Sequence, residues 1–330
     1  SSARLSPPVF SDITDAAERL RGHARVTPLL ESDRLNERLG GRLLVKPEML
    51  QETGSFKFRG AFNRLSRLGE TERAAGVVAY SSGNHAQGVA AAARLLGMPA
   101  VIVMPRDAPE TKIAGTRAHG AEVVFYDEAS ERREEVAELL AGKRGATLVR
   151  PYEDVDVVAG QGTVGLELAA QAGAAQAALD AVLVPCGGGG LVAGTALVLA
   201  KVCPAAELWA VEPQGFDDTR RSLAAGERLE IAPGAKSFCD ALLAPTPGKL
   251  TFALNRRLLA GGLAVDDATV AAAMRDAFTY LKVVAEPGGA VALAAALSGA
   301  FDCRGKTVAV ICSGGNVDPE AFGKVLGETA

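Results

Sequence analysis

Residues 77–104 read VVAYSSGNHAQGVAAAARLLGMPAVIVM and contain the pattern that decides the fold. A β-branched run at Val77–Tyr80 precedes an alanine-rich helical stretch at Ala86–Leu96, and a second apolar run follows at Val101–Met104. A strand, a helix and a second strand in this order bring the two strands together in parallel. The stretch therefore predicts an α/β protein built on a parallel sheet.

The same alternation extends along the chain and predicts a second parallel sheet. Further strands are expected at Glu122–Tyr126, Thr147–Arg150, Ala181–Pro185, Leu208–Val211 and Thr307–Cys312, with helices at Glu110–His119, Ser130–Ala141, Gly160–Ala172 and Leu191–Val202. We expect residues 75–155 to form a small domain inserted into a large domain of residues 1–74 and 156–330. The stretch Ile231–Thr251, rich in proline, glycine and alanine, is expected to be a long loop that lines a site.

The composition indicates a globular protein and excludes several classes of function. Of the 330 residues, 48% are hydrophobic and 22% are charged, which allows a buried core. The net charge of −4, without a basic block, disfavours a nucleic-acid partner. No apolar run approaches the about 20 residues that a membrane span needs, so no membrane partner is expected. The N-terminus carries no signal pattern, which predicts a cytoplasmic location.

The cysteines predict free thiols. They number five, an odd count, and are scattered without C-x-x-C spacing, which disfavours a disulfide framework and a zinc site. They stand at Cys186, Cys203, Cys239, Cys303 and Cys312.

Three glycine-containing turns follow predicted strands, at Ser81–His85, Gly187–Gly190 and Ser313–Asn316. Open α/β sheets bind ligands outside the carboxyl ends of their strands, where these turns are expected. Four consecutive glycines before a helix offer unhindered N–H groups, so Gly187–Gly190 predicts a phosphate site. A dinucleotide fingerprint does not fit, because Leu191 stands where that pattern requires glycine.

Lys57 stands between two phenylalanines, in the segment GSFKFRGA at residues 54–61. A lysine held among apolar groups loses its charge more readily, which suits a nucleophile that forms a Schiff base. The alternative is a surface lysine that extends its charge to water between two buried aromatic rings. The motif alone favours neither interpretation.

Taken together, the SFKFRGA segment around Lys57, the SSGNH turn, the four glycines and the SGGN turn resemble a known family in their order along the chain. They are similar to the motifs of fold type II pyridoxal-phosphate (PLP) enzymes, most closely the serine/threonine dehydratase and serine racemase group. The resemblance covers nearly the whole chain. It implies two open, twisted, mostly parallel sheets with flanking helices, and a cofactor in the cleft between a large and a small domain.

The resemblance also implies which residues hold the cofactor. Lys57 would carry it covalently, with Ser55 and Phe56 beside it. The phosphate would bind at Gly187, Gly188, Gly189 and Gly190, the ring hydroxyl at Asn84 and the pyridine nitrogen at Ser313. His85 is expected to orient Asn84. Glu286 would organise the pocket or, alternatively, act as an acidic residue at a helix N-terminus.

Further residues would bind the substrate and a metal ion. The substrate carboxylate would bind at Ser81, Ser82, Gly83, His85 and Arg133. For Arg133 a plain helix-surface role is an open alternative. Ser82 would be the catalytic acid/base of a racemase or merely a lining residue of a dehydratase. Glu212, the Phe216 carbonyl and Asp218 resemble a Mg²⁺ or Ca²⁺ site, against the alternative of an acidic surface loop.

The implied activity is that of a PLP-dependent ammonia-lyase (dehydratase). It would eliminate water from L-serine, L-threonine or a related β-hydroxy amino acid and release a 2-oxo acid and ammonia. A neutral Ser313 makes the ring a weaker electron sink, which favours elimination. The alternatives are a serine racemase with side dehydratase activity and, from another class, a binding protein without chemistry. Resemblance predicts a homodimer.

Some positions depart from the family pattern and leave the substrate open. Residues Ser237–Ala241 stand where relatives often have Ala-Asp-Gly, Ala244 replaces a serine, and His119 replaces a tyrosine. These changes leave room for a bulkier or acidic β-hydroxy amino acid.

Overall fold

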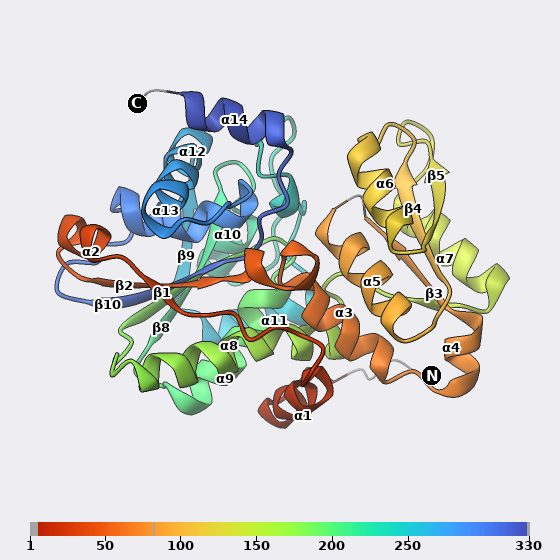
Figure 1. Ribbon diagram of the computed structural model, residues 1–330, viewed down its shortest axis with the longest axis horizontal. Coiled ribbons are helices and arrows are strands. Elements are labelled where there is room, and N and C mark those ends of the chain that lie inside the picture. The colour runs from red at the N-terminus through yellow and green to blue at the C-terminus, as the bar shows by residue number, and fades with distance from the viewer. Residues whose placement is uncertain (1–5, 82, 329–330) are drawn as a thin grey trace.

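The computed structural model describes residues 6–81 and 83–328 and contains two sheets that lie side by side (Figure 1). The larger has the strand order β1-β2-β10-β7-β8-β9, and the smaller has the order β5-β4-β3-β6. The larger sheet comprises β1 (Leu30–Glu31), β2 (Arg42–Pro47), β7 (Ala181–Pro185), β8 (Glu207–Pro213), β9 (Gly261–Val265) and β10 (Thr307–Cys312). The smaller comprises β3 (Val77–Tyr80), β4 (Ala100–Pro105), β5 (Glu122–Tyr126) and β6 (Thr147–Leu148). Neighbouring strands are parallel except β1 and β2, which confirms the predicted α/β class.

Helices cover both faces of each sheet. The described helices are α1 (Phe10–Leu20), α2 (Asp33–Leu39), α3 (Lys57–Ser66), α4 (Glu70–Ala75), α5 (Asn84–Leu95), α6 (Glu110–Ala118), α7 (Arg133–Arg144), α8 (Val155–Ala174), α9 (Gly190–Val202), α10 (Asp218–Ala225), α11 (Lys249–Leu258), α12 (Asp267–Asp276), α13 (Val291–Ser298) and α14 (Pro319–Gly327). The strand side chains alternate between two cores: Leu183 lies in the core shared with α12 and α13, whereas Val182 and Val184 lie in the core shared with α8 and α9. Burial on both faces explains why these strands are continuous apolar runs.

The chain divides between two lobes, which we define by their sheets. The small lobe is β3–β6 with α5, α6 and α7, all of which fall within residues 77–148, and the large lobe is the six-stranded sheet with the helices packed on it. Helix α3 runs between the lobes, because it packs on α5 on one side and on α8 on the other (Figure 1). The first residue of this helix, Lys57, therefore lies where the lobes meet.

Several expected elements have different bounds, for local reasons. The helix expected at Gly160–Ala172 begins at Val155, because Asp154 caps it by accepting from the N–H groups of Asp156 and Val157. The helix expected from Ser130 begins at Arg133. The strand expected to reach Arg150 ends at Leu148.

The long loop expected at Ile231–Thr251 is present. It contains only a short 3₁₀ helix, η3 (Asp240–Leu242), before α11 begins at Lys249. All five cysteines are free, and no described helix is both long and apolar enough to cross a membrane.

Candidate active site

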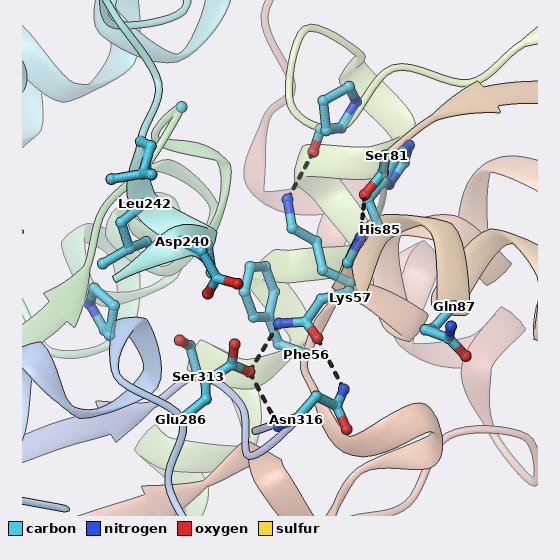
Figure 2. A pocket seen from close by; sticks show the side chains of 18 of the residues that line it. Phe56, Lys57, Ser81, His85, Gln87, Asp240, Leu242, Glu286, Ser313 and Asn316 are labelled. Carbon is cyan, nitrogen blue, oxygen red and sulfur yellow. Dashed lines mark hydrogen bonds between the residues drawn. The ribbon is translucent and has the colours of Figure 1, made fainter. Parts of the chain in front are cut away.

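A cavity of about 500 Å³ lies between the two lobes, at the carboxyl ends of β3, β7 and β10. Its lining includes residues from all three glycine-containing turns, together with Lys57 and the loop residues Asp240–Ala244. Figure 2 shows Lys57, Glu286 and Ser313 around this cavity. The first and the last of these turns are more than 200 residues apart in the sequence, and the parallel sheets bring them to one place.

Lys57 extends into the cavity from the first turn of α3. Its Nζ donates to the Pro151 carbonyl at 3.3 Å and lies 5.2 Å from the centre of the Phe56 ring. No carboxylate of the described residues pairs with it. Desolvation therefore lowers the pKa of Lys57 to about 8. This environment favours the nucleophile interpretation over a surface lysine.

The four glycines form a turn between β7 and α9. No acceptor within the described chain pairs with the N–H groups of Gly187–Gly190, whereas the Gly188 carbonyl accepts from Thr251 Oγ1 at 2.6 Å. A Cβ at Gly188 would collide with the ring of Tyr152, and Gly189 has a φ of +95°. The sequence thus places unpaired donors at the start of a 13-residue helix, an arrangement that binds anions.

The segments around Ser55 and Ser313 are held against each other. The Phe56 N–H donates to the Ser313 carbonyl at 3.1 Å, and Ser55 forms an antiparallel bridge with Gly314. Both serines are buried, and Ser313 lines the cavity. Phe56 also lines the cavity, next to Lys57.

Asn84 is oriented by the large lobe. Its Nδ2 donates to Glu286 Oε1 at 2.8 Å, and its Oδ1 accepts from Asn316 Nδ2 at 2.8 Å. Glu286 is buried, and desolvation raises the pKa of its carboxyl to about 7. Of the two roles considered for Glu286, the structure therefore favours organisation of the pocket.

The expectation that His85 orients Asn84 is wrong. His85 Nε2 lies 3.0 Å from the carbonyl of Val149, the residue that follows β6, so the ring is turned toward the end of β6. Desolvation lowers the pKa of His85 to about 3, which leaves the imidazole neutral, with Nε2 donating to that carbonyl. His85 lines the cavity all the same.

The residues expected to bind a substrate carboxylate lie on the small-lobe side. Ser81 Oγ accepts from the Gly83 N–H at 3.0 Å just before α5 begins, and both residues line the cavity. Ser82 lies outside the described residues. Arg133 begins α7 and lines the cavity, with its guanidinium 5.4 Å from the centre of the Tyr80 ring and its Nε 3.3 Å from Glu134. Its side chain thus has both a cavity-facing and a surface environment.

Glu212 near the end of β8 and Asp218 at the start of α10 do not line this cavity. Both are buried, so an acidic surface loop is the wrong interpretation. Glu212 accepts from the N–H groups of Thr219 and Arg220 at 2.9 and 2.7 Å, whereas Asp218 Oδ2 has no partner within the described residues. Phe216, which stands between Glu212 and Asp218 in the sequence, is also buried. The described residues contain no cluster of three or more His, Cys, Asp or Glu side chains that could hold a metal ion.

Several lining residues were not assigned from the sequence. Tyr152 belongs to no motif, and only the packing of its ring on Gly188 reveals it. Asn316 was part of the SGGN turn, but its bond to Asn84 depends on the meeting of the two lobes. Lys112 and Asp240 also line the cavity, and no local pattern marks the lysine.

Comparisons with known proteins agree with this geometry. Residues 20–314 match the family model of the pyridoxal-phosphate dependent enzymes. The chain is 46% identical over 317 residues to an L-threo-3-hydroxyaspartate ammonia-lyase of Pseudomonas sp, covering 96% of this chain and 98% of the relative. It is 37% identical over 327 residues to a serine racemase of Schizosaccharomyces pombe, covering 99% and 100%. A crystal structure of a threonine deaminase from T.th. superimposes with a TM-score of 0.89 at 44% identity, covering 94% of this chain and 99% of that one. The chain therefore belongs to the pyridoxal-phosphate dependent enzymes, and its fold is that of the fold type II members.

Proposed function

We propose that this enzyme is an ammonia-lyase that eliminates water from a β-hydroxy amino acid and releases a 2-oxo acid and ammonia. The observation that carries the proposal is the environment of Lys57, whose amine faces the cavity without a carboxylate partner in the described chain. The similarity to an ammonia-lyase and a threonine deaminase supports the reaction class.

The cavity fits the cofactor. The free N–H groups of Gly187–Gly190 would hold its phosphate, Asn84 its ring hydroxyl and Ser313 its pyridine nitrogen, with Ser55 and Phe56 packed beside Lys57. When bound, PLP supplies an electron sink that makes the α-proton of an amino acid acidic. The hydrogen bonds of Asn84 with Glu286 and Asn316 orient its side chain for the contact with the ring hydroxyl.

Lys57 is the base in this proposal. Because its pKa is lowered to about 8, a useful fraction of its Nζ is uncharged near neutral pH and can take the α-proton. Ser313 offers a neutral hydroxyl rather than a carboxylate to the pyridine nitrogen. A site with a neutral partner favours a reaction in which the leaving hydroxyl takes the electrons away, which is elimination.

The substrate carboxylate would bind at the start of α5, where Ser81, Gly83 and His85 meet the cavity. The N-terminus of a helix favours an anion, and Arg133 adds a positive charge on the same side.

A racemase is the second candidate, supported by the similarity to a serine racemase. Racemisation needs an acid on the face opposite Lys57, the role proposed for Ser82. The test supplies the cofactor-loaded enzyme with L-serine and measures pyruvate, ammonia and D-serine. Pyruvate and ammonia in equal amounts, with little D-serine, support the lyase. D-serine in excess of pyruvate, abolished by Ser82→Ala, would replace the lyase with the racemase.

We also propose a Mg²⁺ or Ca²⁺ ion bound by Glu212, Asp218 and the Phe216 carbonyl. The buried, unpartnered Asp218 Oδ2 fits a hard cation, which prefers oxygen ligands. A melting temperature that falls with a chelator and recovers with the divalent ion is expected. An unchanged melting temperature argues against the ion.

A homodimer, the family expectation, is tested by light scattering.

A further inference from the structure

One ion pair crosses from lobe to lobe inside the cavity. Lys112 Nζ of α6 lies 3.1 Å from Asp240 Oδ2 of η3, and both residues line the cavity. The side chains are 28% and 59% exposed, and Lys112 has no other acidic partner in the described chain. An ion pair this exposed contributes little to stability, so its partners can be exchanged.

Lys112 lies on α6, which packs on α5, the helix whose start is the place proposed for the substrate carboxylate. Thr116 Oγ1 accepts from Gln87 Nε2 at 3.1 Å and donates to the Lys112 carbonyl at 2.9 Å. These bonds hold α6 against the first turns of α5. The charge of Lys112 lowers the pKa of Glu286 and that of Asp240 raises it, so both charges lie within electrostatic reach of the Asn84–Glu286 pair.

Lys112 lies on α6, whereas another cation of the cavity wall, Arg133, begins α7. It stacks on Tyr80, and its charge lowers the pKa of His85. Lys112 is among the charges that act most on Glu286, whereas Arg133 is among those that act most on His85. The cavity therefore presents two separate positive positions apart from Lys57. A β-hydroxy amino acid with a single carboxylate needs only one of them.

We propose that Lys112 binds the second carboxylate of a dicarboxylic β-hydroxy amino acid, and that this carboxylate displaces Asp240 from the lysine. The inference rests on the proposed function and specifies its substrate class. When a substrate carboxylate replaces the carboxylate of Asp240, the charge of Lys112 stays compensated. The side chain of serine or threonine has no carboxylate that could replace Asp240. Lys112 is thus a specificity-determining residue, and Asp240 competes with the substrate.

The test compares ligands with and without the second carboxylate. Isothermal titration of the cofactor-loaded enzyme with L-aspartate and L-alanine, neither of which has a hydroxyl to eliminate, measures binding independently of lyase activity. Lys112→Met is expected to weaken the binding of L-aspartate at least about tenfold and to change the affinity for L-alanine by less than about twofold. Asp240→Asn, which frees the lysine, is expected to tighten L-aspartate binding. The same variants are expected to shift kcat/KM for L-threo-3-hydroxyaspartate but not for L-serine.

Thr111→Val is the matched control. Thr111 Oγ1 donates to Asp318 Oδ1 at 3.3 Å, so this variant removes another contact between α6 and the large lobe without changing a charge. It is expected to affect both ligands alike. Equal effects of Lys112→Met on both ligands, or weaker L-aspartate binding in Asp240→Asn, would overturn the inference. Selective loss of L-aspartate binding in an enzyme that releases no 2-oxo acid would support the inference and refute the lyase proposal.

Discussion

Asn84 Nδ2 donates to Glu286 Oε1 at 2.8 Å, a bond between residues 202 positions apart that joins the first residue of α5 to the large lobe. Glu286 Oε1 also accepts from the Asn316 N–H, and Asn316 Nδ2 donates to Asn84 Oδ1. The amide of Asn84 therefore has one orientation, in which its Nδ2 is directed at the acid. The buried carboxyl is the group on which this arrangement depends.

The pH dependence of stability should reveal Glu286. Its folded pKa of about 7 lies above the usual value of 4.5, so its contribution to stability is complete below about pH 4.5 and is lost as pH rises through 7. Glu286→Gln keeps an acceptor but cannot ionise. Between about pH 5 and about pH 8, the free energy of unfolding of the variant should rise relative to wild type by about 2 kcal/mol. Urea unfolding at each pH measures this, and a difference that does not vary with pH argues against the buried acid.

The reactivity of Lys57 should follow its lowered pKa. In apo-enzyme the rate at which pyridoxal phosphate is captured should rise with pH around a midpoint of about 8, because only the uncharged amine attacks. The measurement is the growth of the visible absorption band after mixing. Borohydride reduction and peptide mapping should place the pyridoxyl group on Lys57. A rate still rising steeply at about pH 10, as for an exposed lysine, would contradict the desolvated environment.

Gly188→Ala should weaken cofactor binding. The added methyl group collides with the Tyr152 ring, so the turn must shift and its free N–H groups lose their alignment. We expect at least about a tenfold loss of affinity for pyridoxal phosphate, measured by fluorescence titration. Gly142→Ala in α7, where nothing lies within 4 Å, is the control and should leave affinity unchanged while slightly raising stability. Equal affinity in both variants would show that the turn does not hold the phosphate.

Arg59 should be essential to stability. Its Nε donates to Glu48 at 2.6 Å and its Nη2 to Glu167 at 2.9 Å, and both Arg59 and Glu48 are fully buried. Arg59→Met leaves buried carboxylates uncompensated and should cost about 3–5 kcal/mol in urea unfolding. The control, Arg67→Met, removes a partly exposed pair with Asp156 and should cost less than about 1 kcal/mol. Similar losses in the two variants would mean that the buried network is not stabilising.

Most strands of the fold could be predicted from the sequence because they are apolar on both faces. Three were missed, for physical reasons, and one of them, β1, is only two residues long. In β9 a Cβ at Gly261 would collide with Trp209 and one at Gly262 with the Arg220 backbone, so the strand requires two residues that usually argue against strands. In β2 the buried Lys46, which donates to Glu167 at 2.9 Å, interrupts the apolar run.

The site was predictable as far as its motifs are local. Lys57, Asn84 and the four glycines each lie in short segments whose chemistry can be recognised. The partners of these residues come from elsewhere in the chain. The bond of His85 to Val149, 64 positions away, replaces the expected contact with its neighbour Asn84. The pairing of Lys112 with Asp240, 128 positions away, likewise depends on how the lobes meet.

The most direct test of the account measures 2-oxo acid and ammonia released by the cofactor-loaded enzyme from L-serine, L-threonine and L-threo-3-hydroxyaspartate, alongside Lys57→Ala. We predict equimolar release from at least one substrate, and a loss of at least about 1,000-fold in the variant while circular dichroism shows an unchanged fold. No release from any of the three, or release that survives the loss of Lys57, would contradict the account.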